Sequence, residues 1–222
     1  WRNNDGSNFE DVSDDFGIED YEGPKNGFGI GDFDGDGWMD FYSCFGESID
    51  GTTIYTYPDR MYRNVHGESF IEITGSFPAE TYEAANTSCV NFIDIDSDGD
   101  QDFYVSRHRY EKNQLLINDG EGSFTNEGGT RYIEGHRDVV PPNVYYGSTI
   151  SSVWFDYDND GDFDLFATNE TRLDNLDYAD QCYLYRNNGN GTFTNVFHLS
   201  GIPFNLTPNN PAVGDYDNDG NL

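Results

Sequence analysis

Two short motifs alternate along this chain with a period of about 60 residues, and this repetition constrains the fold more than any other feature. The first is an aspartate-rich nonapeptide, DFDGDGWMD in its first copy, with copies that begin at Asp32, Asp94, Asp156 and Asp215. The starts are separated by 62, 62 and 59 residues. The second is a polar turn, YRNNGNGTF in its last copy, with copies that begin at Trp1, Tyr62, Leu116 and Tyr185. Two interleaved motifs with one period indicate one structural unit repeated along the chain.

Short runs of aromatic and β-branched residues flank both motifs and predict β-strands. Such runs precede the four aspartate motifs, at 27–31, 88–93, 151–155 and 211–214. Others follow the three complete copies, at 40–45, 102–106 and 164–169. The polar turn joins two more, as in QCYLYRN (181–187) and GTFTNVF (191–197), and its Asn and Gly residues suit the positive φ of a tight hairpin. No window shows a sustained 3.6-residue apolar period, so we expect few helices.

Each unit is therefore predicted to be a four-stranded antiparallel meander. Arrayed sheets of this kind are the blades of a β-propeller, and we interpret residues 1–222 as a single all-β propeller segment of about 3.6 blades. A β-sandwich is the alternative all-β fold, but it does not explain a 60-residue repeat. Because propellers close with typically 4–8 blades, we expect the segment to be a fragment of a larger propeller or an arc completed by another chain.

The composition excludes several classes of partner. The chain carries 42 Asp and Glu against 11 Lys and Arg, for a formal net charge of −31, which disfavours binding to nucleic acid or to an anionic membrane surface. Aromatic residues make up 16%, which argues against disorder. No run approaches the roughly 20 apolar residues of a transmembrane helix. The cysteines Cys44, Cys89 and Cys182 form no CxxC pair, which disfavours a zinc or redox site, and their odd number leaves one free or paired with another chain.

Crowded carboxylates in the nonapeptide predict a site for a hard divalent cation. Positions 1, 3, 5 and 9 are aspartates in every complete copy, and the glycine at position 6, such as Gly37, permits a sharp bend. Six to eight oxygen ligands suit Ca²⁺. The predicted side-chain ligands are Asp32, Asp34, Asp36 and Asp40; Asp94, Asp96, Asp98 and Asp102; Asp156, Asp158, Asp160 and Asp164; and Asp215, Asp217 and Asp219. Position 7 is predicted to add a backbone carbonyl, from Trp38, Asp100 and Asp162.

Three other interpretations of the nonapeptide are weaker. An EF-hand loop requires a Glu at position 12 and flanking helices, whereas position 12 is Ser43, Val105 or Ala167 and the flanks predict strands. Mg²⁺ prefers few protein ligands and keeps several waters. A metal-free Asx-rich turn does not explain three complete copies with the same four aspartates. The fourth copy lacks position 9 in this sequence, and we expect it to be weak or empty if the chain ends at Leu222.

The strand–DxDxDGxxD–strand unit, alternating with the RNNGxGxF hairpin, resembles the FG-GAP/VCBS repeat found in integrin α subunits and in many secreted proteins. The resemblance covers essentially the whole chain. It implies an extracellular, seven-bladed β-propeller in which the aspartate loop joins the first and second strands of a blade and holds Ca²⁺ at the residues named above. Gly27-Phe28-Gly29 matches only the first half of the FG-GAP signature, so the chain is nearer to the VCBS branch.

The strand order predicts that the aspartate loops and the polar turns share one face. The long connections, 46–60, 107–113, 126–148 and 169–181, then share the opposite face, where binding surfaces tend to lie. They carry a group of basic and aromatic residues: Arg107, His108, Arg109, Tyr110, Arg131, Tyr132, His136, Arg137, Tyr145, Tyr146 and Arg172. Either this group forms a patch for a carboxylate-bearing glycan or protein, or its members pair locally with the abundant acids.

Three functions remain open from the sequence. The leading hypothesis is an extracellular calcium-stabilised module with a structural or adhesion role, whose partner is a protein, a glycan or other copies in an assembly. A glycan-binding lectin and a polysaccharide-acting enzyme are the alternatives, although no catalytic motif is recognised and we expect no enzyme. Four N-glycosylation sequons, at Asn86, Asn169, Asn190 and Asn205, matter only in a secreted eukaryotic protein.

Overall fold

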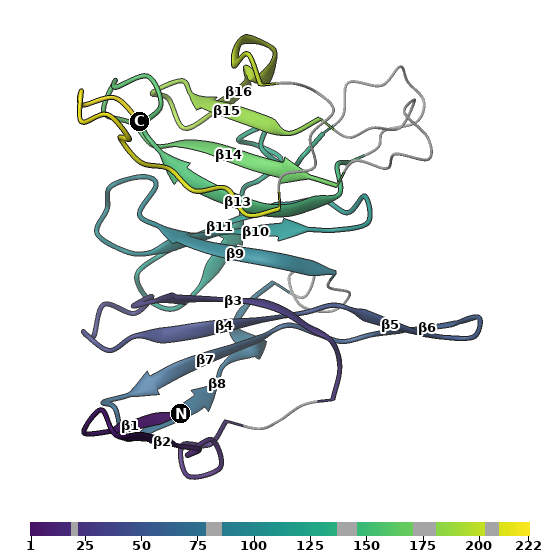
Figure 1. Ribbon diagram of the computed structural model, residues 1–222, viewed down its shortest axis with the longest axis vertical. Helices are drawn as coiled ribbons and strands as arrows, with labels where there is room; N and C mark the ends of the chain where they lie inside the picture. Colours follow the sequence, from purple (N-terminus) through teal and green to yellow (C-terminus); the bar gives the residue numbers. More distant parts are fainter. Residues whose placement is uncertain (19–21, 79–85, 137–145, 171–180, 203–208) are drawn as a thin grey trace.

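The fold comes from a computed structural model that describes residues 1–18, 22–78, 86–136, 146–170, 181–202 and 209–222. It contains three four-stranded antiparallel sheets, which follow one another along the long axis of the molecule (Figure 1). The first blade consists of β3 (Lys25–Gly31), β4 (Asp40–Phe45), β7 (Arg60–Val65) and β8 (Ser69–Glu72). The second consists of β9 (Thr87–Ile93), β10 (Asp102–Arg107), β11 (Gln114–Asn118) and β12 (Phe124–Asn126). The third consists of β13 (Thr149–Phe155), β14 (Asp164–Asn169), β15 (Tyr183–Asn187) and β16 (Phe193–Asn195).

In the second and third blades every strand pairs with the next one along the chain, and in the first blade β4 pairs with β7 across an insertion. The first strands are neighbours, with β9 between β3 and β13, so the blades fan out from this inner row. A two-stranded hairpin, β1 (Arg2–Asn4) and β2 (Asn8–Glu10), precedes the first blade and carries the first polar turn. The prediction of an all-β fold built from four-stranded propeller blades is therefore confirmed.

Apolar side chains fill the space between successive sheets. One cluster lies between the first and second blades and includes Tyr42, Phe77, Phe103 and Phe124. A second lies between the second and third blades and includes Tyr104. Alternate residues of β10 therefore face opposite neighbours, and all six residues of this strand are buried. This two-sided burial explains why the strands are continuous apolar runs rather than alternating patterns.

A repeated insertion completes each interface between blades. After the fourth strand, the chain turns and places one apolar side chain between this sheet and the next: Phe77 after the 3₁₀ turn η1 (Thr74–Ser76), and Ile133 after β12. In the third blade the corresponding Phe197, in η3 (Phe197–Leu199), packs against Leu184 and Phe166 of the same blade. Phe77 stacks on Phe124 with ring centroids 4.6 Å apart, and Ile133 is fully buried. Burial of one such side chain stabilises the fold by about 1.5–3 kcal/mol.

The glycines of β3 are explained by the close approach of two inner strands. A Cβ at Gly29 would lie 2.5 Å from a methyl carbon of Val90, and one at Gly27 would lie 2.7 Å from the carbonyl oxygen of Ser88. Both neighbours belong to β9 of the next blade. The GFGIG run thus reflects packing between blades, a requirement that residue type alone does not reveal.

A buried polar group at the start of the third strand joins each of the first two blades to the next. Asp59 is fully buried and accepts hydrogen bonds from Tyr42 Oη (2.8 Å), Thr87 Oγ1 (2.6 Å) and the backbone N–H of Phe45 (2.7 Å). In the second blade Asn113 takes this place. It accepts from the backbone N–H of Arg107 (2.8 Å) and donates to Thr149 Oγ1 (2.9 Å). The same junction is built once with a carboxylate and once with an amide.

Two expectations from the sequence are wrong at the level of single elements. Residues 211–214 form no strand. In the three blades, the first strand pairs with the second strand of the same blade, and the described residues contain no second strand that could pair with 211–214. The connection 46–60 is not a plain loop: β5 (Glu47–Asp50) and β6 (Thr53–Thr56) form a hairpin that projects from the first blade (Figure 1).

Cys44, Cys89 and Cys182 are all free thiols in the structure. Within the described residues, every helix is too short or too polar to cross a bilayer.

We expect Gly29→Ala to destabilise the protein by about 1–3 kcal/mol, because the added methyl group overlaps Val90 in a packed interface between blades. Gly75→Ala is the matched control, since a Cβ there meets nothing within 4 Å, and it should change stability by less than about 0.5 kcal/mol. Urea unfolding of both variants measures the difference. Equal stability of the two variants would show that β3 and β9 do not approach as described.

We expect Asp59→Asn to reduce the loss of stability that occurs on raising the pH. Burial raises the pKa of Asp59 to about 6, although its hydrogen-bond donors oppose the shift. A carboxyl group with a raised pKa in the folded state favours folding when protonated, so its contribution falls as the pH rises from about 4 to about 6. The asparagine side chain of the variant does not ionise, and the second blade already has an asparagine, Asn113, at the equivalent place. The free-energy difference between variant and wild type should change in favour of the variant by about 3 kcal/mol between pH 4 and pH 7, measured by urea unfolding in EDTA. A constant difference would contradict the assignment.

Candidate metal centre

The aspartate loops connect the first and second strands of each blade. They lie between β3 and β4, between β9 and β10, and between β13 and β14, on the same face as the polar hairpin turns (Figure 1). Close contacts between the two kinds of turn support this placement: a Cβ at Gly67 would meet the ring of Trp38, and one at Gly120 would meet the carboxylate of Asp100. Strands flank every complete loop, so the EF-hand interpretation is excluded and the predicted shared face is confirmed.

The aspartate at position 1 folds each loop through its own backbone. Both oxygens of Asp32 accept hydrogen bonds, from the N–H of Asp36 at 3.1 Å and from that of Gly37 at 2.8 Å. Equivalent pairs of hydrogen bonds are made by Asp94, Asp156 and Asp215. The four loops thus have the same conformation, the incomplete fourth copy included.

Two residues of each loop adopt the left-handed conformation. Position 6 is glycine in every copy and has φ between 89° and 99° in the complete loops, which confirms the bend predicted at Gly37. Position 4 is also left-handed, and here only the first loop uses glycine. Ser97, Asn159 and Asn218 take this place in the other copies, with φ near 60°. Asn is among the residues that tolerate this conformation best, and Ser tolerates it less well.

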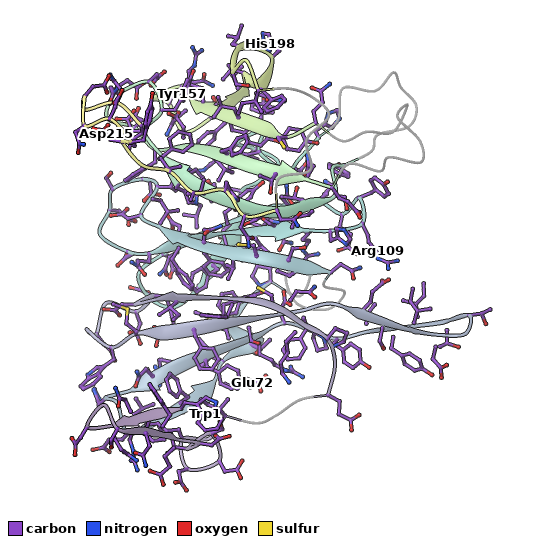
Figure 2. The ribbon with its side chains drawn as sticks, in the orientation of Figure 1. Trp1, Glu72, Arg109, Tyr157, His198 and Asp215 are labelled. Carbon is purple, nitrogen blue, oxygen red and sulfur yellow. The ribbon has the colours of Figure 1, made fainter. Side chains whose placement is uncertain are left out.

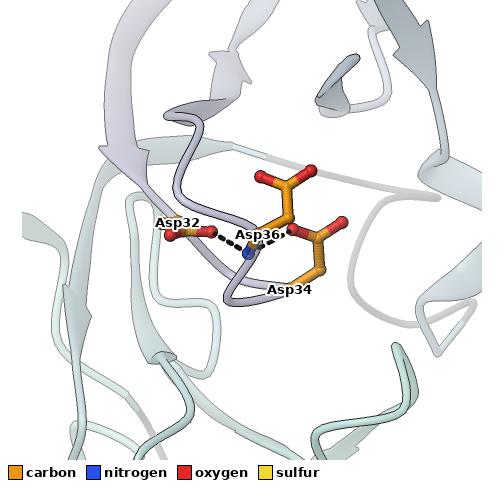
Figure 3. Close-up of side chains that lie close together, drawn as sticks. All are labelled: Asp32, Asp34 and Asp36. Carbon is orange, nitrogen blue, oxygen red and sulfur yellow. Dashed lines mark hydrogen bonds between the residues drawn. The ribbon is translucent and has the colours of Figure 1, made fainter. Parts of the chain in front are cut away.

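Carboxylate oxygens converge in all four loops, with at least three within 4.8 Å of one another in each. In the first loop the group is Asp32, Asp34 and Asp36 (Figure 3). The groups in the other loops are Asp94, Asp96 and Asp102; Asp156, Asp158 and Asp164; and Asp215, Asp217 and Asp219. Three predicted ligands lie outside these groups: Asp40 at position 9 of the first loop, and Asp98 and Asp160 at position 5 of the second and third.

The aspartate at position 9 has a second task that the sequence pattern did not reveal. Asp40 is fully buried, and its oxygens accept hydrogen bonds from the N–H of Phe33 at 3.1 Å and from that of Asn64 at 2.7 Å. Asn64 belongs to the polar hairpin turn of the same blade. This carboxylate therefore holds the aspartate loop and the polar turn together.

The same link is present in the other two blades. Asp102 accepts from the N–H of Asn118 at 2.8 Å, and Asp164 accepts from that of Asn187 at 2.7 Å. The amide side chains of these asparagines donate back to the backbone carbonyl of the residue before the aspartate. The sequence did contain a sign of this link: every polar turn, RNN or IND, has an asparagine at the same position. We interpreted this asparagine only as a turn residue.

Burial and mutual repulsion weaken the acidity of several loop carboxyl groups. Burial raises the pKa of Asp40, Asp102 and Asp164 to about 6, against the effect of their backbone hydrogen bonds. Burial, followed by the neighbouring carboxylate at position 5, also raises the pKa of Asp34 and of Asp96. A dication among these groups would favour their ionised form, which is the electrostatic match expected of a metal loop.

Position 7 contributes to the loop through its N–H group. The amides of Trp38, Asp100 and Asp162 donate to the carboxylate at position 5, at 2.9–3.0 Å. The role predicted for the carbonyls of these residues stays a prediction. So does coordination by Asp98 and Asp160, whose carboxylates are already oriented by these amides.

One arginine predicted on the opposite face lies beside an aspartate loop instead. Arg131 pairs with Glu127 at 2.7 Å, and its guanidinium lies 3.8 Å from Asp96 in the second loop. The prediction that Arg131 belongs to the long-loop patch is therefore wrong. The reason is that residues 128–133 turn back between the second and third blades, where Ile133 is buried, and this turn carries Arg131 to the edge with the aspartate loops.

The comparison with known families agrees with this geometry. The family model of the FG-GAP-like repeat matches residues 94–167 and 156–222, which together make up more than half of the chain. The chain belongs to the FG-GAP-like repeat family. No curated protein matches it. Each match begins at one aspartate loop and extends into the next, so the two matches share the loop at 156–164, and the second match includes the incomplete fourth copy.

On the opposite face, the cations of this FG-GAP chain are paired with acids. Arg109, which lies at the end of the molecule away from Asp215, forms an ion pair with Glu47 (Figure 2). Further ion pairs are Arg107 with Glu111 (3.4 Å) and Lys112 with Glu134 (2.9 Å), and the His108 ring is hydrogen-bonded to Glu170 at 3.1 Å. Local pairing therefore describes these residues better than a free basic patch. Arg137, Tyr145 and Arg172 lie outside the described residues.

Two of the four sequons are closed to glycosylation in the folded protein. Asn86 is 6% exposed and donates to Glu47 and Glu111, and Asn169 is fully buried and donates to the carbonyl of Gln181. Asn190 is exposed in the last polar turn, and Asn205 lies outside the described residues. A carbohydrate chain needs an accessible amide, so of the described sequons Asn190 alone offers an open acceptor.

We expect Arg131→Gln to increase the calcium affinity of the second loop by roughly 3- to 10-fold. The guanidinium beside Asp96 repels an incoming dication and partly neutralises one ligand, and its removal is worth about 1 kcal/mol at this partly exposed site. Calorimetric titration at low ionic strength should show about one equivalent with tighter binding. Arg2→Gln, which removes an exposed partner of Glu10, is the control and should leave the titration unchanged. Weaker binding in the Arg131 variant would contradict this role.

Proposed function

We propose that this chain is an extracellular calcium-binding β-propeller module with a structural or adhesion role. The observation that supports it most is the convergence of at least three carboxylates within 4.8 Å in each of four loops. These loops are already folded by their own backbone hydrogen bonds. The backbone of each loop then needs little reorganisation on binding, and in each complete loop one further aspartate (Asp40, Asp98 or Asp160) would turn toward the ion.

The donor set suits calcium. The residues that would hold the ion are the aspartates at positions 1, 3, 5 and 9 of each complete loop, and they offer only oxygen, the donor that hard cations prefer. When bound, Ca²⁺ supplies positive charge that offsets the repulsion among these groups. The protein's own residues supply the rest, since the position 9 carboxylate ties the loop to the neighbouring hairpin. Calcium would therefore stabilise the blade and not only the loop.

The proposed extracellular setting rests on the repeat family and is compatible with the charge of the chain. A chain with net charge −31 stays strongly acidic even with every loop filled, and calcium sites of extracellular modules can be as weak as roughly 10⁻⁴–10⁻³ M. FG-GAP repeats are typical of such proteins. We propose the long-loop face as the recognition surface for a protein, a glycan or another copy, because the opposite face is occupied by the metal loops.

The proposal is of a binding module without catalysis. A polysaccharide-acting enzyme is the alternative, and Glu111 and Glu134 on the long-loop face would be its candidate acids. Release of reducing ends from neutral or acidic polysaccharides, lost in both single Glu→Gln variants, would overturn the non-enzymatic proposal. Absence of turnover with retained calcium binding would support it.

We expect calcium to raise the melting temperature and EDTA to lower it. At a free concentration of 100 times the dissociation constant, each site adds about 2.7 kcal/mol to the free energy of unfolding. Asp96→Asn should remove the contribution of one loop, whereas Asp50→Asn, an exposed residue of the β5–β6 hairpin, should remove none. Differential scanning calorimetry with and without 5 mM calcium, at roughly physiological salt, measures both effects.

The pH dependence of this calcium effect is a further check. Ion binding requires ionised ligands, and Asp40, Asp102 and Asp164 have pKa values of about 6 in the metal-free fold. The melting shift caused by calcium should therefore be full near pH 7.5 and should fall as the pH drops through 6. A melting temperature that does not respond to calcium at pH 7.5 would overturn the proposed function.

A further inference from the structure

A polar cleft opens on the long-loop face of the second blade. It has a volume of about 680 Å³, within the range of small-ligand sites. Its walls are the turn that carries Arg107 and Lys112, the start of β11 at Gln114, the end of β12, the segment that contains Glu134, and Tyr146. The metal loops lie at the other end of the strands, so the cleft is separate from them (Figure 1).

One residue that lines this cleft, Tyr110, has an unusual backbone conformation, and two others lie near it in the sequence or beside a neighbouring hollow. Eight described residues other than glycine have positive φ, and five of them belong to aspartate loops or polar hairpin turns. The other three are Arg109, Tyr110 and Tyr132, with φ between 57° and 64°. Tyr110 lines the cleft, and Tyr132 lines a second hollow that shares Gly129 and Glu134 with it. Bulky residues in this conformation are strained, and such strain tends to persist at binding sites.

The charged groups of the cleft are arranged as balanced pairs. Arg107 pairs with Glu111 at 3.4 Å, and Lys112 pairs with Glu134 at 2.9 Å. The Lys112 ammonium also lies 5.2 Å from the centre of the Tyr146 ring, and the His136 ring meets that of Tyr146 edge-on. Two cations and two carboxylates leave no net charge in the cleft, while the whole chain has −31. The surrounding field therefore opposes an anionic ligand.

These groups match an uncharged, hydroxyl-rich ligand. Carboxylates accept hydrogen bonds from hydroxyl groups, ammonium and guanidinium groups donate to them, and the amide of Gln114 can do both. A tyrosine ring offers an apolar surface for the C–H face of a sugar ring, with a polar end near its hydroxyl groups. Because the ion pairs are already formed, they are oriented before the ligand arrives, which reduces the entropy lost on binding.

We propose that this cleft binds a neutral saccharide, with the sugar ring on Tyr146 and its hydroxyl groups on Glu134, Lys112 and Gln114. This inference rests on the proposed use of the long-loop face for recognition and names the ligand class. It differs from the carboxylate-bearing ligand expected from the sequence, because the cations that would have received a carboxylate are paired within the chain.

The test is a titration of the calcium-loaded chain with four neutral sugars (glucose, galactose, mannose and N-acetylglucosamine) and with glucuronic and galacturonic acid. Saturation-transfer NMR detects binding and calorimetry measures it. At least one neutral sugar should bind with a dissociation constant in the low millimolar range or below. The uronic acid with the same ring should bind at least 10-fold more weakly. Failure of all four neutral sugars at 20 mM, or tighter binding of the acid, would overturn the inference.

Variants locate the site. Tyr146→Ala and Lys112→Gln should each weaken binding of the positive sugar at least 10-fold. Tyr55→Ala, on the exposed β5–β6 hairpin, should not change it. Lys112 is exposed on the surface, so its variant will fold even if the tyrosine variant does not. Binding that survives in Lys112→Gln and in folded Tyr146→Ala would overturn the inference.

The calcium-dependent melting shift of each protein separates the two proposals. A normal shift without sugar binding would overturn only the saccharide inference. If calcium does not raise the melting temperature of the wild type, the calcium-module proposal is overturned, whatever the result with sugars.

Discussion

The fold depends on the burial of both faces of every sheet by its neighbours. A four-stranded blade of this size has apolar side chains on both sides, and β10 shows the result, with Phe103 packed toward the first blade and Tyr104 toward the third. A blade that lacked a neighbour would expose one of these surfaces. The close approach of β3 to β9, which requires glycine, and the inserted Phe77 serve the interface between the first and second blades, and Ile133 serves the next one. Stability is therefore a property of the array.

The metal loops are coupled to this array through a single kind of carboxylate. The aspartate at position 9 lies at the start of the second strand, where it is buried, and it accepts hydrogen bonds from its own loop and from the asparagine of the polar turn. An ion bound nearby would act on a group that already joins two connections of the blade. This arrangement explains why two motifs that are far apart in the sequence repeat with the same period.

The two ends of the strands have different chemistry. One end carries carboxylates in excess, with a few arginines such as Arg131 close to them. The other carries ion pairs in balance, around a cleft with tyrosine walls. The excess of carboxylates suits a dication, and the paired charges suit an uncharged ligand. The high net charge of the chain therefore does not by itself determine the ligand of each site. Charges that neutralise one another locally matter more than the total.

The sequence by itself determined the repeat, the strands, the positions of the loops and their donor atoms. It could do so because these depend on local features: short runs of aromatic and β-branched residues, glycine where φ is positive, and aspartate at fixed spacing. The predicted bend at Gly37 is an example. Tertiary structure alone decided which carboxylates converge, since Asp102 and Asp164 join their groups whereas Asp40 does not. It also decided the partners of Asn64, the place of Arg131 and the burial of Asn86. These depend on contacts between residues that are distant in the chain, and no periodic pattern records such contacts.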